Sequence, residues 1–120
     1  QANPTEYAQF FGAVADAIHA IGDPRIKVLN APLSPGGDYD NLAFINAMLR
    51  AKPSILWKFD YWATHPYPGN HPPEYNIHDG SAGNVNRLTI DSYQLELAQL
   101  AAWGRTGVKV ILSETGYAIG

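Results

Sequence analysis

The sequence predicts an α/β fold in which three helices alternate with three parallel strands. Apolar residues recur at spacings of three and four over residues 4–21, a pattern typical of a helix that packs one face against a sheet. Residues 108–112 form an unbroken apolar run rich in β-branched side chains, which is typical of a parallel strand buried on both faces. Helix-like and strand-like segments take turns along the chain, and that order favours parallel strands joined by crossover connections.

The first helix has a clear start signal. Asn3 is a good N-cap, Pro4 suits the first turn, and Glu6 stands three residues after the cap, as in a capping box. Gly22 predicts the end of this helix. Because the helix is amphipathic, one of its faces must pack against the rest of the fold.

A short strand is expected at residues 26–31, and the prolines and glycines after it indicate a loop. Asn30 lies near the end of this strand and shares a face with Ile26 and Val28. Its side chain could therefore face the same edge of the sheet as the end of the last strand and bind a hydroxyl group of a ligand. The alternative is an Asn that caps a turn, which is the more common role of this residue type.

The second and third helices are shorter. Asp38 or Asp40 can cap the second helix, and Pro53 limits it to about three turns. Thr89 or Asp91 can cap the third helix, which ends before residues 104–107. The buried stripe of the third helix is expected to consist of Tyr93, Leu97, Leu100 and Ala101.

An aromatic strand is expected within residues 59–68, between these two helices. His65 and Tyr67 are two residues apart near its end, so both side chains point the same way. The polar stretch 69–84 that follows carries no periodic apolar pattern. Loops of this length in small domains are usually functional or disordered. This loop leaves the same strand end as His65 and Tyr67, so we expect it to wall or cover a site there.

The last strand leads into Glu114, which is the centre of the candidate site. Because side chains alternate along a strand, Glu114 shares a face with Val110 and Leu112. A carboxylate in line with core residues is costly unless it lies at the edge of the sheet or is hydrogen-bonded. Parallel α/β folds place their chemistry at the carboxyl ends of the strands. The alternative is a structural carboxylate that caps a helix or forms a salt bridge.

Length and composition exclude several classes of function. The chain of 120 residues, 46% of them hydrophobic, has material for one modest core, so residues 1–120 form one domain. A formal net charge of -3 with eight Lys and Arg residues offers no basic surface, and we expect neither nucleic acid nor a membrane as partner. The absence of cysteine excludes disulfides and thiol chemistry. We expect neither a cofactor nor a bound metal.

Two motifs carry a resemblance to a known family. The chain has His-x-Tyr at 65–67 and Ser-Glu-x-Gly at 113–116, and it resembles clan A retaining glycoside hydrolases, the cellulase- and mannanase-like (β/α)8 barrels. In that clan the sixth strand ends near His-x-Tyr and the seventh ends in the nucleophilic Glu. The resemblance implies that Glu114 is the nucleophile, that Tyr67 holds it ionised, and that His65 donates to the substrate or orients the acid. The substrate would be a β-linked oligo- or polysaccharide.

The resemblance also implies that the chain is about half of a (β/α)8 barrel, running from the fourth helix to the seventh strand. Such barrels take roughly 250 residues, so the remainder of the barrel, in the same or another chain, is an expected partner. The acid/base of the clan is a Glu that follows Asn, and this sequence contains no Asn-Glu pair. The proton donor would then precede Gln1, and the isolated chain would be inactive. Export from the cell is favoured by the resemblance alone, and a small open α/β sandwich is the alternative fold.

Three further residues would bind the substrate. Asn30 could bind a sugar hydroxyl, and Tyr75 and Tyr117 lie beyond strand ends, where their rings could stack on a pyranose. The structural alternatives are a hydrogen-bonded boundary histidine for His65 and a rim aromatic for Tyr67. An observed exposed ring that faces the site would favour the stacking role.

Two other functions stay open. One is a metal site, although the spacing of its candidate ligands matches no helix-borne pair. Those ligands are His65, His71, His78 and Asp79 or Glu74. The other is a carbohydrate-binding or structural module, derived from a barrel, that has lost its chemistry.

Overall fold

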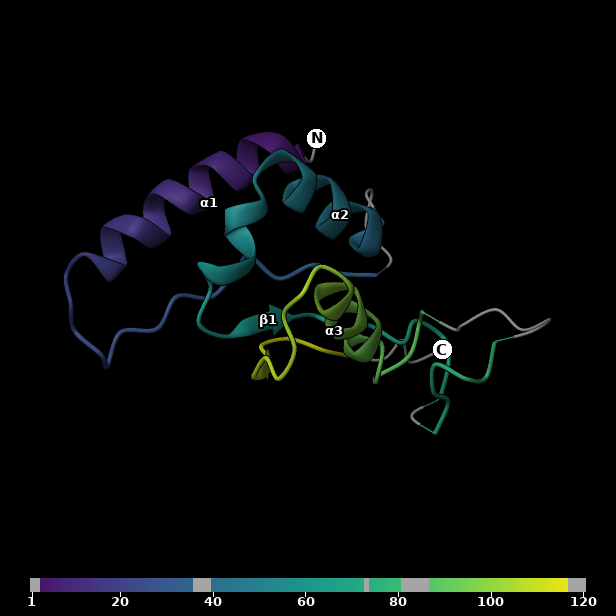
Figure 1. Ribbon diagram of the computed structural model, residues 1–120. Coiled ribbons are helices and arrows are strands. Elements are labelled where there is room, and N and C mark those ends of the chain that lie inside the picture. The colour runs from purple at the N-terminus through teal and green to yellow at the C-terminus, as the bar shows by residue number, and fades with distance from the viewer. Residues whose placement is uncertain (1–2, 36–39, 73, 81–86, 117–120) are drawn as a thin grey trace.

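The computed structural model of the protein describes residues 3–35, 40–72, 74–80 and 87–116. Within these ranges the chain forms three α-helices and a two-stranded sheet (Figure 1). In chain order the elements are helix α1 (Pro4–His19), helix α2 (Asn41–Ala51), the 3-10 helix η1 (Pro53–Trp57), strand β1 (Trp62–Thr64), helix α3 (Tyr93–Ala102) and strand β2 (Val110–Leu112). None of the helices in these ranges has the length and apolar character that a membrane span needs.

Local sequence signals set the starts of the first two helices. The side chain of Asn3 accepts hydrogen bonds from two backbone N–H groups of the first turn of α1, at 3.1 Å each, which confirms it as the N-cap. The Asp40 side chain caps α2 by accepting a bond from the backbone N–H of Ala43 at 3.3 Å. Asp38, the other predicted cap, lies outside the described residues.

The caps predicted for the third helix are wrong. Helix α3 begins after Ser92, whose side chain makes no capping bond. Thr89 donates instead to the Asp91 carboxylate at 2.7 Å, and Asp91 also accepts the backbone N–H of Ile77 at 3.1 Å. These two polar side chains therefore hold the preceding loop against the helix start.

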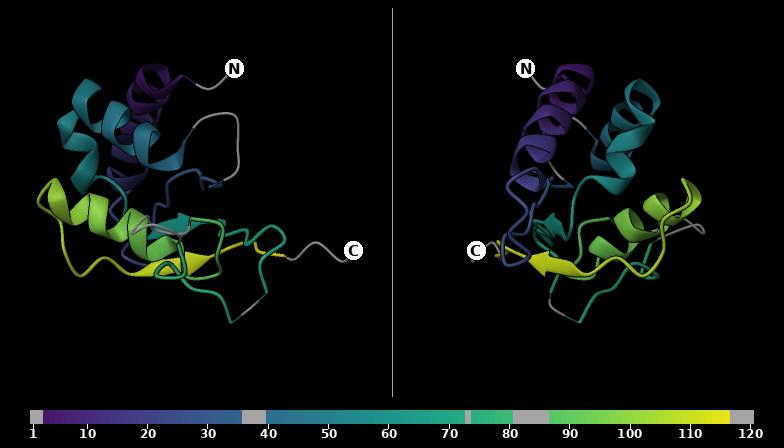
Figure 2. Two further views of the ribbon diagram at one scale, coloured as in Figure 1. Left: turned by 90° about the vertical axis from the view of Figure 1, so that its right-hand side faces the viewer. Right: turned by 60° about the vertical axis from the view of Figure 1, so that its left-hand side comes forward.

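Strands β1 and β2 pair in parallel, with helix α3 as the crossover between them. The paired residues are Trp62 with Val110, Ala63 with Ile111 and Thr64 with Leu112. Helices α1 and α2 lie side by side, and the three helices occupy one side of the two strands (Figure 2). The carboxyl ends of both strands consequently point toward the same edge of the molecule.

The fold class predicted from the sequence is wrong. The described residues form a two-stranded sheet, not three strands that alternate with three helices as part of a (β/α)8 barrel. The first expected strand, residues 26–31, contributes a single isolated parallel bridge between Leu29 and Tyr61. The prediction was correct for the parallel pairing of the two later strands and for the helix that connects them.

Side chains interrupt backbone pairing on both sides of that bridge. The Asp60 carboxylate accepts the backbone N–H of Val28 at 2.7 Å. The Asn30 side chain accepts the N–H of Ala63 at 2.7 Å and donates to its carbonyl at 3.0 Å. Because these side chains take positions that main-chain groups fill in a regular ladder, the pairing does not extend into a third strand.

The core lies between the helices and β1. Its buried members are Ala8, Phe11, Ala15, Val28, Phe44, Ile45, Met48, Leu49, Ile55, Leu56, Phe59, Trp62 and Leu100. In α3 the expected stripe is partly wrong, because Ala101 is exposed and Glu96 is buried in its place. Strand β2 is also more exposed than predicted, with Ile111 at 38% and Leu112 at 44% of their surface open. Helix α2 packs against both α1 and α3. Trp62 of β1 belongs to the same buried cluster as side chains of these helices, and β2 pairs with β1.

Candidate active site

The carboxyl ends of β1 and β2 meet because the two strands are parallel. His65 and Tyr67 follow β1, and Glu114 follows β2, at the same edge of the sheet. The backbone N–H of Ser113 donates to the Thr64 carbonyl at 3.3 Å, which continues the pairing beyond the strands. We refer to His65, Tyr67, Ser113 and Glu114 together as the strand-end cluster.

Glu114 is the exposed acid of this cluster, with 56% of its side chain open to solvent. The Tyr67 hydroxyl donates a hydrogen bond to Glu114 Oε2, and His65 Nδ1 lies 3.7 Å from the same oxygen. The bond to the carboxylate raises the pKa of Tyr67 above its ordinary value, so the phenol keeps its proton at neutral pH and remains a donor. Glu114 thus lies beside both expected neighbours, while the catalytic roles of all three stay predictions.

Ser113 is a member of the cluster that sequence reasoning missed. Its hydroxyl lies 3.0 Å from His65 Nε2. The imidazole therefore lies between two groups, with Ser113 at one nitrogen and Glu114 near the other. The register of the two strands could have predicted this contact, because Thr64 pairs with Leu112. His65 follows Thr64 and Ser113 follows Leu112, so the two residues are neighbours across the strands.

Beyond Glu114 the chain stays close to the segment that follows β1. The Thr115 hydroxyl donates to the Pro66 carbonyl at 2.5 Å. A Cβ placed on Gly116 would lie 3.6 Å from the ring of Tyr67, so this ring packs along the backbone of the last described residues. Both residues of the Ser-Glu-x-Gly motif that follow Glu114 therefore help to hold the two strand ends together.

Asn30, predicted to bind substrate, is 4% exposed. Its amide nitrogen donates to the carbonyls of Ala63 at 3.0 Å and Ala31 at 3.1 Å, and its oxygen accepts the N–H of Ala63. Both N–H bonds of the amide are thus used by the backbone. These contacts give Asn30 a structural role in the fold, and its binding of a sugar stays a prediction.

The two tyrosines predicted to stack on sugar have different outcomes. Tyr75 is 42% exposed and stacks on His71, with ring centroids 5.4 Å apart and planes inclined by 26°. It belongs to the loop that leaves the end of β1, and this loop runs on the same side of the molecule as the segment that follows β2 (Figures 1 and 2). Tyr117 lies outside the described residues.

The candidate metal ligands do not assemble. Among the residues that the structure describes, no three His, Asp or Glu side chains come together in a way that could hold a metal ion. His71 Nδ1 bonds instead to the Leu88 carbonyl at 2.6 Å, and Asp79 accepts the backbone N–H of Asn76 at 2.7 Å. These bonds give the loop its shape and lend no support to the metal alternative.

A buried acid, Glu96 of α3, was also missed from the sequence. It has no exposed surface, and it accepts bonds from Asn41 Nδ2 at 2.7 Å and from Trp62 Nε1 at 2.8 Å. Burial raises the pKa of Glu96 even though these donors favour its charged form. Glu96 therefore joins α2, α3 and β1, and it has no access to a ligand.

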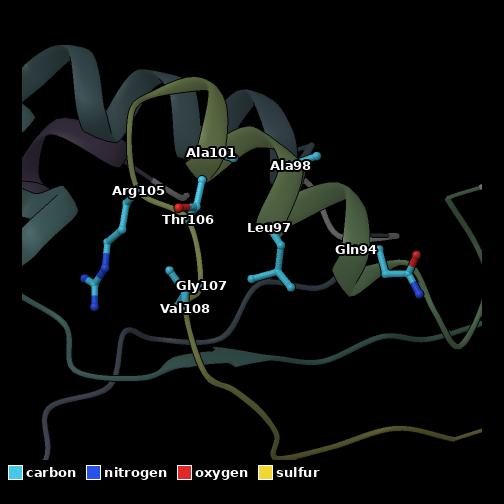
Figure 3. Close-up of a pocket in the computed structure, with 8 residues that line it drawn as sticks. All are labelled: Gln94, Leu97, Ala98, Ala101, Arg105, Thr106, Gly107 and Val108. Atoms are coloured by element: carbon cyan, nitrogen blue, oxygen red, sulfur yellow. The ribbon is translucent and has the colours of Figure 1, made fainter.

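One pocket lies away from the strand-end cluster, between α3 and residues 105–108 (Figure 3). Its volume is about 370 Å³. The lining residues are Gln94, Leu97, Ala98, Ala101, Arg105, Thr106, Gly107 and Val108. They include one cation and neither a carboxylate nor an imidazole, and the Arg105 guanidinium already donates to the carbonyls of Leu56 and Phe59 at 2.8 Å. This pocket offers no acid and base for catalysis.

A smaller polar pocket, of about 220 Å³, lies near the amino end of β1. His19 Nε2 lies 3.0 Å from Asp60 Oδ2 there. The same Asp60 oxygen accepts the backbone N–H of Val28. The pair fastens the end of α1 to the segment before β1, which is a structural role.

Comparison of the chain with known protein families, with characterised proteins and with solved structures finds no match.

Proposed function

We propose that this protein is a retaining glycoside hydrolase in which Glu114 is the nucleophile. The proposal rests on the contact of an exposed Glu114 carboxylate with the Tyr67 hydroxyl and the His65 imidazole. A retaining glycosidase needs an ionised carboxylate that is open to substrate and held in one orientation. The resemblance of two motifs to clan A enzymes supports the same assignment, although the described residues do not form the implied part of a barrel.

In the first step a Glu114 oxygen attacks the anomeric carbon of a sugar. A bond forms between the carboxylate and that carbon while the glycosidic C–O bond breaks, and the departing oxygen takes a proton from an acid. In the second step water attacks the same carbon, gives up a proton to the conjugate base of that acid, and releases the carboxylate. The product keeps the anomeric configuration of the substrate because the carbon is inverted twice.

The acid of this reaction lies outside the strand-end cluster, which contains one carboxyl group. Retaining enzymes hold the two carboxyl groups about 5 to 5.5 Å apart. A leaving group that departs as a stable anion, such as dinitrophenolate, needs no proton. The nucleophilic step can therefore be tested without knowing the acid.

Covalent trapping tests the role of Glu114. The protein is incubated with dinitrophenyl 2-deoxy-2-fluoro-β-glycosides of glucose, mannose and xylose, in which fluorine slows hydrolysis of the glycosyl ester, and is then examined by peptide mass spectrometry. We expect one fluoro-sugar on the peptide that contains Glu114 and none in Glu114→Gln. Glu6→Gln, which changes an exposed glutamate of α1, should be trapped like the wild type.

An adduct on a different residue would contradict the proposal. Absence of an adduct with every sugar of the panel, in protein shown to bind the matching oligosaccharide, would do the same. That second result favours the other candidate, a carbohydrate-binding protein without chemistry. The observation that supports this candidate is the exposed stack of Tyr75 on His71.

A further inference from the structure

The loop after β1 presents an aromatic surface outside the strand-end cluster. Tyr75 is 42% exposed and lies on His71 with the rings stacked. A pyranose ring has one face made mostly of C–H groups, which packs on an aromatic face, and a rim of hydroxyls, which need hydrogen-bond partners. The two rings together therefore match the chemistry of a sugar unit.

Hydrogen bonds order the segment that carries these two rings in the absence of a ligand. The N–H of His71 donates to the Pro68 carbonyl at 3.1 Å, and the N–H of Tyr75 donates to the Pro72 carbonyl at 3.0 Å. His71 Nδ1 is bonded to the Leu88 carbonyl at 2.6 Å. Binding on a surface that is already ordered loses little conformational entropy.

The loop is also anchored to the core beyond Tyr75. Ile77 is 7% exposed, and its N–H donates to the Asp91 carboxylate at 3.1 Å. A local turn over residues 76–79 surrounds that anchor, in which the Asp79 side chain accepts the N–H of Asn76 and the Asn76 side chain accepts the N–H of His78. A segment without helix or strand thus holds a defined shape around its exposed ring.

The bond to Leu88 also decides which nitrogen of His71 carries a proton. A carbonyl oxygen can only accept, so His71 Nδ1 must be the donor. In the neutral ring Nε2 is then an acceptor, and no bond to it occurs among the described residues. Nε2 can accept a sugar hydroxyl beside the apolar face of Tyr75.

This surface lies close along the chain to Tyr67, which bonds to the proposed nucleophile. His71 lies four positions after Tyr67 in the sequence, and four residues span at most about 14 Å. We propose that His71 and Tyr75 form a glycan-binding platform for a sugar unit next to the one that Glu114 attacks. The protein then acts on oligo- and polysaccharides in preference to simple glycosides. This inference rests on the proposed function.

Binding in a non-hydrolysing variant tests the platform. Glu114→Gln is titrated with β-linked gluco-, manno- and xylo-oligosaccharides from disaccharide to hexasaccharide, and binding is followed by calorimetry. We expect affinity to rise with chain length for one series. Adding Tyr75→Ala should weaken binding of the longer members about tenfold and remove the advantage of length, because the stacking contact is lost.

Two further variants make the test specific. Tyr75→Phe keeps the ring and should retain the length dependence, whereas His71→Ala removes the support of the ring and should lose it. Phe10→Ala removes an aromatic side chain of α1 that is 68% exposed and should bind like the parent. Thermal melting shows that each variant is folded.

Equal affinity of the parent and the Tyr75→Ala variant for the longer oligosaccharides would overturn the platform. So would an equal loss of affinity in Phe10→Ala. The nucleophile is judged separately, since trapping uses single sugar units. Binding that depends on Tyr75 without an adduct on Glu114 would keep the platform and reject the hydrolase.

Discussion

Glu96 and Glu114 are two glutamates of one small molecule with opposite surroundings. Glu96 has no exposed surface and accepts bonds from Asn41 and Trp62. Glu114 has 56% of its side chain open to solvent, with Tyr67 bonded to one oxygen. The buried carboxylate therefore stabilises the packing of α2, α3 and β1, whereas the exposed carboxylate is accessible to the carbon atom of a substrate.

The two acids also show how a shifted pKa should be weighed. Burial raises the pKa of Glu96, and an acid with a raised pKa is often a candidate proton donor. A catalytic acid must reach the atom that it protonates. Glu96 has no exposed surface, so we assign its shifted pKa to the energetics of folding and not to catalysis.

The largest expected effect is the loss of the buried acid. Glu96→Ala should lower the free energy of unfolding by about 3–5 kcal/mol, because two buried N–H donors lose their acceptor and a cavity opens. Glu114→Ala should change it by less than about 0.5 kcal/mol, as is usual for an exposed side chain. Urea denaturation of both variants in one buffer measures the difference. Equal destabilisation by the two substitutions would contradict the comparison.

The second expected effect is a pH dependence of stability that comes from Glu96. Its pKa in the folded protein is raised, so the folded state holds this proton more tightly than the unfolded state. The stabilisation is complete below the unfolded pKa, close to 4.5, and is lost as the pH rises through the folded pKa, by up to about 1.4 kcal/mol per pH unit. Glu96→Gln cannot titrate and should lack this component.

Urea midpoints of the wild type and of Glu96→Gln, measured at a series of pH values from 4 upward, isolate the component as a difference between two curves. Glu114→Gln serves as the matched control, since it removes an exposed carboxylate by the same substitution. A wild type whose stability falls with pH no faster than that of Glu96→Gln would show that Glu96 does not carry the effect.

Local signals and strand ends were predictable from the sequence. Asn3 caps α1 because its side chain needs only the first turn of the helix that it precedes. The approach of Glu114 to His65 and Tyr67 follows from two parallel strands, whose carboxyl ends must share an edge. The first inference uses geometry within one helical turn, and the second uses only the rule that parallel strands end at the same edge, so neither needs the details of side-chain packing.

The missed features depend on contacts between distant residues. Residues 26–31 have the pattern of a strand, but Asn30 and Asp60 bond to main-chain groups that a third strand would need. Glu96 lies on a helix, where an acidic residue usually indicates a solvent-facing position, and only its partners on two other elements make burial possible. Propensity and periodicity describe one segment at a time, so neither could reveal these contacts.

The smallest expected effect on stability comes from removing the hydrogen bond between Tyr67 and the exposed acid Glu114. Tyr67→Phe removes the hydroxyl that bonds to Glu114 and leaves the ring beside Gly116. The free energy of unfolding should change by less than about 0.5 kcal/mol, because the bond is exposed. The rate of trapping by the activated fluoro-glycoside should fall about tenfold, because the carboxylate loses its fixed orientation. Tyr61→Phe makes the same change on a tyrosine before β1 and should be trapped at the rate of the wild type. An unchanged trapping rate in Tyr67→Phe would make Tyr67 a rim aromatic with no part in the reaction.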